Sequence, residues 1–151
     1  MSQLNRQTSP LHMIESISHI TFIVKDVRRT ADFFRSVFNA EEIYYSSEKS
    51  FSTSYEKFFI IGGTWIAVME GEPLSERSYN HIAFKVPETE FDACVLKLRA
   101  LGVEFDEGRS RAEGEGRSIY FYDFDNHLFE LHTGTLAERL SRYASDNPLK
   151  S

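Results

Sequence analysis

The chain has 151 residues, of which 41% are hydrophobic and 26% charged, with a net charge of −6 at pH 7. This length suits one globular domain or two small fused modules, and the negative charge without a basic stripe argues against a nucleic-acid partner. No apolar run reaches membrane-spanning length, so we expect no membrane partner. A single cysteine, Cys94, excludes an internal disulfide and favours a cytoplasmic location.

The first half of the chain predicts a strand, a helix and three further strands. Residues 1–12 are polar and predict a disordered extension, and a first module is expected over residues 13–76. "SHITFIVKDVRRTADFFRSVFNAEEI" starts at Ser18 with an alternating strand pattern, and Asp26 is a typical helix N-cap. The strands "EEIYYS", "KFFIIGG" and "TWIAVMEG" follow.

The second half repeats this order over residues 77–134. "NHIAFKVPETEFDACVLKLRALGVEF" predicts a strand and a helix, with Pro87 in its first turn and Gly102 at its end. The strands "VEF", "RSIYFYD" and "HLFELHTG" complete it. In residues 135–151, a capping box predicts a last helix and a tail.

The two halves align as an internal repeat, which determines the architecture. His19 and His81 are 62 positions apart and both begin a His-x-x-Phe-x-Val strand. Near the end of each half, "IAVMEG" aligns with "FELHTG" at an offset of 63, so that Glu130 corresponds to Ala67. The sequence therefore predicts an α+β fold of two repeated βαβββ modules.

The repeat brings His19, His81 and Glu130 to related places. A carboxylate inside an apolar strand is costly unless a cation or strong donors satisfy it, and two imidazoles with one carboxylate suit a divalent metal with open positions. Taken singly, each has an ordinary structural explanation, as a hydrogen-bonded core histidine or an edge glutamate. Structural roles are expected at four other positions, in the tail, a turn, a strand end and a helix core: His12, His127, His132 and Cys94.

Four segments carry a resemblance to a known family: "SHITFIVKD", "EKFFIIGGTWIAVMEG", "NHIAFKV" and "EGEGRSIYFYDFDNHLFELHTGTLAERL". They resemble the vicinal oxygen chelate (glyoxalase/bleomycin resistance/dioxygenase) superfamily, and within it the fosfomycin-resistance branch and its epoxide-hydrolase (FosX) type. The likeness runs from about Met13 to about Tyr143. It implies curled mixed sheets that form a metal-binding cup, in a domain-swapped homodimer where His19 meets His81 and Glu130 of the partner subunit.

The resemblance also implies roles for individual residues. It implies Mn²⁺ bound by His19, His81 and Glu130, fosfomycin as substrate, and Glu56 as the general base. The substrate-binding residues that it implies are Thr21, Trp65, Tyr79, Tyr120, Arg139 and Arg111. Thiol-transferase relatives carry a Lys, a Ser and a potassium loop where this chain has "RSRAEGEG" at residues 109–116. There Gly114 replaces the Ser, and either Arg111 or Arg109 replaces the Lys.

The expected activity is the metal-dependent addition of water to the epoxide of fosfomycin, which gives the diol and antibiotic resistance. Three alternatives stay open at this point. One is a fosfomycin thiol transferase of the same fold, another a non-catalytic drug-sequestering binding protein, and the third an iron-dependent ring-cleaving dioxygenase with the same ligand triad.

Overall fold

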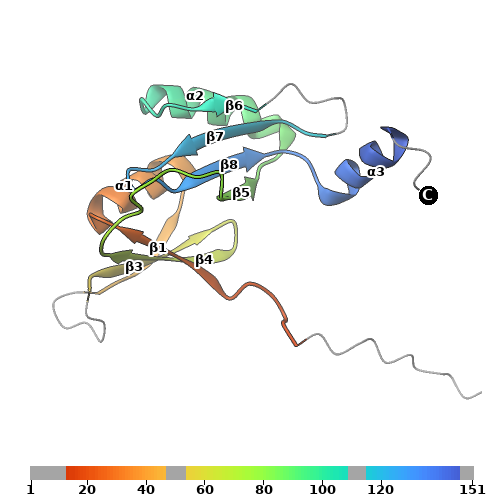
Figure 1. The fold of residues 1–151 in the computed structure, drawn as a ribbon. Helices are drawn as coiled ribbons and strands as arrows, with labels where there is room; N and C mark the ends of the chain where they lie inside the picture. Colours follow the sequence, from red (N-terminus) through yellow and green to blue (C-terminus); the bar gives the residue numbers. More distant parts are fainter. Residues whose placement is uncertain (1–12, 47–53, 109–114, 147–151) are drawn as a thin grey trace, which may run out of the picture.

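The structure is a computed structural model that describes residues 13–46, 54–108 and 115–146. In this part of the chain, two four-stranded mixed sheets are combined with three α-helices and one short 3₁₀ helix (Figure 1). The predicted α+β class is confirmed.

Each sheet is built from one half of the sequence. The first sheet, sheet A, has the strand order β1-β4-β3-β2, and its strands are β1 (His19–Val24), β4 (Thr64–Glu70), β3 (Glu56–Ile61) and β2 (Glu41–Tyr45). The second, sheet B, has the order β5-β8-β7-β6, and its strands are β5 (His81–Lys85), β8 (Leu128–His132), β7 (Ser118–Tyr122) and β6 (Asp106–Glu107). The helices are α1 (Val27–Phe38), η1 (Glu88–Glu90), α2 (Phe91–Ala100) and α3 (Leu136–Asp146).

Strand pairing confirms the repeat residue by residue. β1 runs parallel to β4 with Thr21 opposite Ala67, and β5 runs parallel to β8 with Ala83 opposite Glu130. Equivalent residues of the two pairs are thus separated by the offsets inferred from the sequence, 62 from β1 to β5 and 63 from β4 to β8. The strand predicted for "VEF" was wrong, because pairing with β7 begins only at Asp106. Val103 and Phe105 are instead partly buried against the core.

The helix boundaries follow the predicted capping signals. The Asp26 carboxylate accepts hydrogen bonds from the backbone N–H groups of Arg28 and Arg29, at 2.9 and 3.1 Å. Pro87 precedes η1, which leads into α2, and Gly102 follows α2 with a φ of 69° that favours glycine. At the start of α3, the Glu138 N–H donates to Thr135 Oγ1 at 3.1 Å.

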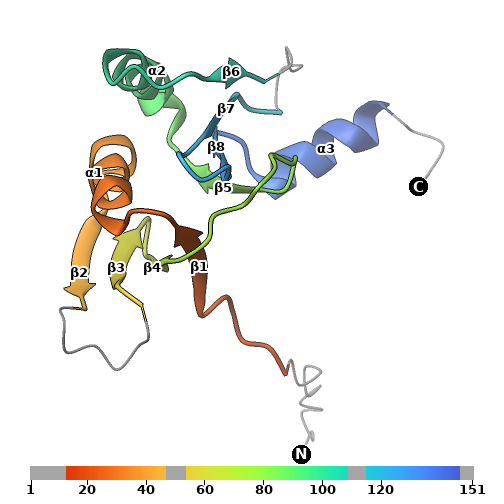
Figure 2. The same cartoon turned by 60° about the vertical axis from the view of Figure 1, so that its left-hand side comes forward.

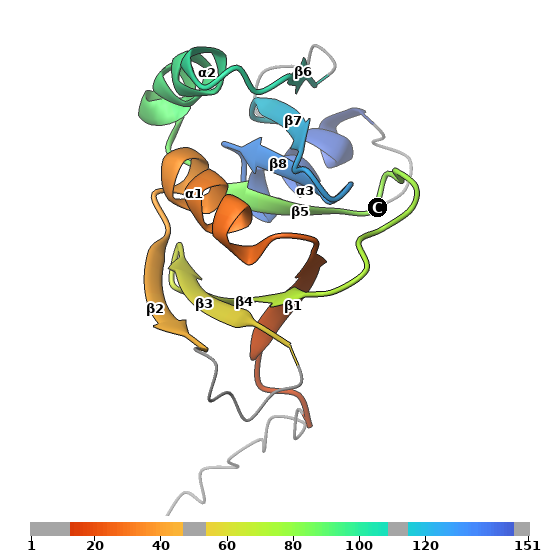
Figure 3. The ribbon, with the colours of Figure 1, turned by 90° about the vertical axis from the view of Figure 1, so that its left-hand side faces the viewer.

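A phenylalanine-rich core joins the two sheets through α1. Phe34 of α1 contacts Phe59 of sheet A at a ring-centroid distance of 5.5 Å, and Phe38 contacts Phe84 of sheet B at 5.1 Å. Phe129 of β8 is fully buried among these rings. Figures 2 and 3 show α1 on sheet A, on the side that faces sheet B. Each sheet therefore has a core face against the helices and an opposite face outside this core, called here its outer face.

Apolar residues outside this core stay uncovered in a single chain. No α3 residue is buried, and Leu136, Leu140 and Tyr143 are 72%, 57% and 46% exposed. Met13 and Ile14, just before β1, are 97% and 82% exposed. None of the helices in the described ranges is long and apolar enough to cross a membrane.

Candidate metal and substrate site

His81 and Glu130 face each other on the outer face of sheet B. His81 Nδ1 lies 2.7 Å from the backbone carbonyl of Tyr79, which can only accept, so Nδ1 carries the proton in the neutral ring. His81 Nε2 then presents a lone pair to Glu130 Oε2, at 3.0 Å. Two electron-donating atoms this close require a proton or a cation between them.

The spacing of these two atoms fits a metal ion. Two donors that are each about 2.1 Å from a metal and at right angles to each other lie about 3.0 Å apart. Glu130 is only 5% exposed, and burial of an ionised carboxylate is costly unless it is paired or binds a metal. His81 and Glu130 are therefore a suitable pair of ligands for a divalent cation.

Two further side chains bind the second oxygen of Glu130. Ser118 Oγ donates to Glu130 Oε1 at 2.6 Å and lies 2.7 Å from His132 Nδ1. His132 Nε2 in turn lies 3.5 Å from Arg139 Nη2, so Ser118 and His132 connect the predicted phosphonate-binding arginine to Glu130.

Tyrosines border this group on the side of β7. Tyr120 lies opposite Glu130 in the β7–β8 register, and its hydroxyl is 3.3 Å from that of Tyr79. Burial, then the hydrogen bond with Tyr79 and the charge of Glu130, raise the pKa of Tyr120 to about 12. Tyr120 is therefore a neutral hydrogen-bond donor at physiological pH.

The remaining predicted residues lie on the outer face of sheet A. His19 stacks on Trp65 with ring centroids 4.3 Å apart, and Thr21 is exposed two residues further along β1. Glu56 is half-buried at the start of β3, opposite Met69 of β4. Because residues that face each other across a ladder share a side of the sheet, Glu56 points to the same face as His19 and Thr21.

A single chain does not bring all of these residues together. We call His19, Thr21, Glu56 and Trp65 the sheet A half-site, and His81, Glu130, Tyr79, Tyr120 and Arg139 the sheet B half-site. Within the described residues, no group of three or more His, Cys, Asp or Glu side chains could hold a metal. His19 thus stays apart from the His81–Glu130 pair, and each half-site holds only part of the predicted ligand set.

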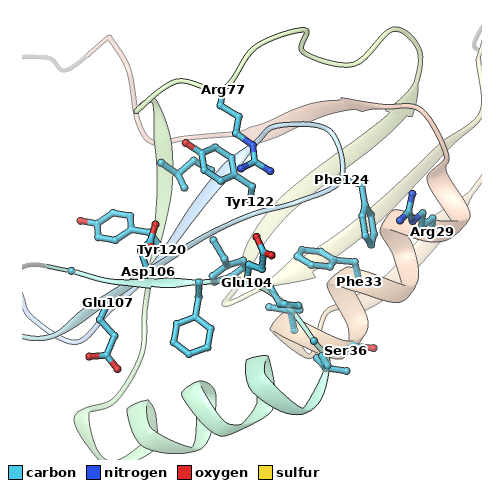
Figure 4. A pocket seen from close by; sticks show the side chains of 18 of the residues that line it. Arg29, Phe33, Ser36, Arg77, Glu104, Asp106, Glu107, Tyr120, Tyr122 and Phe124 are labelled. Carbon is cyan, nitrogen blue, oxygen red and sulfur yellow. The ribbon is translucent and has the colours of Figure 1, made fainter.

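A cavity of the described chain lies elsewhere. It has a volume of about 900 Å³ and lies between α1, the connection 101–108 and β7 (Figure 4). Arg29 stacks over Phe124 and Arg77 over Tyr122 at its walls, at 3.5 and 4.2 Å from the ring centroids. Tyr79 and Tyr120 line this cavity, but His81 and Glu130 do not, so the two candidate metal ligands lie outside it.

Two further arginines, Arg111 and Arg117, are close to the second sheet in the sequence. Arg111 falls outside the described residues. Arg117 forms an ion pair with Asp92 at 3.0 Å and stacks over Phe91 at 4.2 Å, both residues of α2. These contacts place Arg117 beside α2, whereas Arg139 lies beside His132.

Sequence reasoning missed the polar contacts of Ser118 and His132, which had been assigned no role at the site. The signal was present, because Glu130 and His132 are two residues apart and so share one face of a strand. Finding Ser118 needed the β7–β8 register, in which it lies opposite His132.

Comparisons with known proteins identify the family. The model of the Glyoxalase/Bleomycin resistance protein/Dioxygenase superfamily matches residues 16–131. This chain belongs to that superfamily. It is also 60% identical over 131 residues to the fosfomycin resistance protein FosX of Listeria monocytogenes, covering 87% of this chain and 98% of that one.

Two further relatives of this superfamily member bear on its chemistry. A crystal structure of a FosX variant from Listeria monocytogenes, complexed with Mn(II) and 1S,2S-dihydroxypropylphosphonic acid, has a TM-score of 0.78 at 58% identity and covers 87% of this chain and 99% of that one. The metallothiol transferase FosB of Staphylococcus saprophyticus is 38% identical over 140 residues, which covers 90% of this chain and 88% of that protein.

Proposed function

We propose that this protein is a manganese-dependent hydrolase that adds water to the epoxide of fosfomycin and so confers resistance to it. The observation that carries the proposal is the facing pair of His81 Nε2 and Glu130 Oε2 at 3.0 Å, in a chain 60% identical to FosX. The phosphonate diol bound in the FosX crystal structure is the product expected from water and such an epoxide.

The complete site is proposed to form between two chains. In a domain-swapped homodimer, the sheet A half-site of one chain faces the sheet B half-site of the other, and a twofold axis gives two equal sites. The uncovered apolar residues of α3 and of the segment before β1 support such an interface. Trp65 Nε1 also supports it, because this buried N–H has no hydrogen-bond partner within the described chain.

The proposed reaction assigns a task to residues of both half-sites. The bound metal supplies Lewis-acid stabilisation of the negative charge that develops on the epoxide oxygen. The Arg139 guanidinium binds the phosphonate through charge-assisted hydrogen bonds, and the neutral Tyr120 hydroxyl is a further donor. The Glu56 carboxylate takes a proton from the attacking water as the new C–O bond forms and the epoxide C–O bond breaks. Protonation of the released oxygen then completes the diol.

Thiol transfer is the second candidate, and the likeness to FosB at 38% identity favours keeping it. A thiol would attack the same carbon, and Glu56 would not be required as a base for water.

A cytoplasmic location is also proposed, in keeping with the single cysteine.

Expression in a fosfomycin-sensitive bacterium tests the resistance function. The chain should raise the minimal inhibitory concentration of fosfomycin, and a His81→Ala variant expressed at the same level should not. The matched control is His127→Ala, since His127 binds Asp123 in a turn at 2.7 Å, outside both half-sites. Equal resistance from His81→Ala and the unchanged chain would refute the proposed metal site.

A further inference from the structure

We propose that Ser118 and His132 are positioning residues for the Glu130 carboxylate. They hold its Oε1 atom so that Oε2 is presented to His81 Nε2 and to the metal. This inference rests on the metal site proposed above and assigns to its carboxylate ligand the residues that orient it.

The hydrogen bonds of this group have a defined direction. Ser118 Oγ has one proton, and the Glu130 carboxylate at 2.6 Å can only accept, so that proton is donated to Glu130 Oε1. His132 Nδ1, at 2.7 Å from the same hydroxyl, must then be the donor to Ser118 Oγ. His132 Nε2 carries the lone pair and faces Arg139 Nη2 at 3.5 Å, which is long for a hydrogen bond but has a donor on the correct side.

Gly134 leaves room for the His132 ring beside Ser118. A Cβ atom on Gly134 would lie 2.8 Å from His132 Nε2 and 2.7 Å from the carbonyl oxygen of Glu115. Only a glycine at position 134 leaves room for the ring where it lies. Ser118 is 6% exposed, so water has little access to compete for its hydroxyl.

The internal repeat offers a comparison within the same chain. In the β3–β4 register, Glu56 lies opposite Met69, just as Ser118 lies opposite His132 in the β7–β8 register. In the first module, the place of Glu130 is taken by Ala67, and no hydroxyl or imidazole occupies the two equivalent positions. The Ser–His pair therefore accompanies the carboxylate ligand and is not a general feature of the βαβββ module.

Direct measurement of Mn²⁺ binding tests the inference without relying on turnover. Electron paramagnetic resonance of a Mn²⁺ titration reports the free ion, and the spectrum of the bound ion reports the symmetry of its ligands. Loss of a partner that orients a metal ligand typically weakens binding by about 10–100-fold. We expect that loss in Ser118→Ala and in His132→Leu, together with a changed spectrum of the bound ion.

Three variants make the test specific. His132→Asn keeps an N–H near the position of Nδ1, so it should bind Mn²⁺ more tightly than His132→Leu. His127→Asn is the matched control, because His127 is also a partly buried histidine bonded through Nδ1, with a side-chain exposure of 11% against 13% for His132. Its Mn²⁺ affinity should equal that of the unchanged chain.

The outcomes separate this inference from the function on which it rests. Unchanged Mn²⁺ affinity and spectrum in both Ser118→Ala and His132→Leu would overturn the positioning role alone. Unchanged affinity in Glu130→Ala would overturn the metal site, and the positioning role with it. If Ser118→Ala does not fold, the test rests on the Mn²⁺ affinities of the unchanged chain, His132→Asn and His132→Leu. Equal Mn²⁺ affinities in these three proteins would overturn the proposal.

Discussion

Replacing Glu130 by Gln should have opposite effects on stability with and without metal. Without metal, the buried Glu130 carboxylate lacks the cation that would compensate for its burial, and its Oε2 atom lies 3.0 Å from His81 Nε2. The Gln amide keeps an oxygen that accepts from Ser118 and offers an N–H to His81. One net hydrogen bond contributes about 0.5–1.5 kcal/mol.

The two conditions give calculable shifts in melting temperature. For a domain of about 150 residues, 1 kcal/mol corresponds to about 2–4 °C, so Glu130→Gln should melt about 1–6 °C above the unchanged chain in chelator. At a Mn²⁺ concentration of about 100 times Kd, binding stabilises the unchanged chain by about 2.7 kcal/mol, or about 5–11 °C. The variant should gain little, so the order of stability inverts.

Differential scanning calorimetry at one protein concentration, with EDTA and with MnCl₂, measures both shifts. Because the stability of the proposed dimer would depend on concentration, the two proteins must be compared at equal chain concentration. A variant that melts below the unchanged chain in EDTA would contradict an uncompensated Glu130 carboxylate in the absence of metal. An equal gain from Mn²⁺ in both proteins would contradict the role of Glu130 as a ligand.

Four other predictions concern the reaction, the assembly and the pH dependence of stability. Glu56→Gln should slow diol formation by about 10²–10⁴-fold while Mn²⁺ binding is kept, as measured by rates and by paramagnetic resonance; a normal rate would exclude Glu56 as the base. Arg139→Lys keeps the charge but loses the planar fork, so the KM for fosfomycin should rise; an unchanged KM would make Arg139 a surface residue. Mixing inactive His19→Ala and Glu130→Ala chains should restore about one quarter of the activity after complete subunit exchange, because half of the dimers then have one intact site. No recovery would argue for sites within one chain. Burial raises the pKa of the Asp125 carboxyl group in the folded protein. The protein is therefore more stable below the ordinary aspartate pKa, where this group is protonated, and it loses that stability as the pH rises through the folded-state pKa. Asp125→Asn should therefore be the more stable protein in urea at pH 7, with the difference closing toward pH 4; a difference that widens there would contradict the sign.

Much of the fold followed from the sequence because the repeat constrains it twice. The alignment of Ala67 with Glu130 is confirmed, because the two residues hold equivalent places in the β1–β4 and β5–β8 pairs. The Asp26 cap also followed, because the signal is local and its hydrogen bonds join residues two and three positions apart. The extent of β6 did not follow, since Val103 and Phe105 alternate as in a strand but are partly buried without pairing.

The candidate site was predictable only in part. The resemblance supplied the metal-binding and catalytic candidates, and the structure distributes them over two outer faces that a single chain does not join. Ser118 and His132 were missed because their contacts depend on the pairing of β7 with β8, which no short motif specifies. Buried polar contacts between strands require the register, whereas ligand candidates can be recognised from residue type and repeat position.

Phosphorus NMR of fosfomycin incubated with the protein and Mn²⁺, in the absence of any thiol, tests the central proposal most directly. We predict conversion of more than one equivalent of fosfomycin to the phosphonate diol, no conversion in EDTA, and the same product when thiol is added. A product that forms only with thiol, as a thiol adduct, would contradict the hydrolase. Unchanged fosfomycin beyond one equivalent would indicate a binding protein without catalysis.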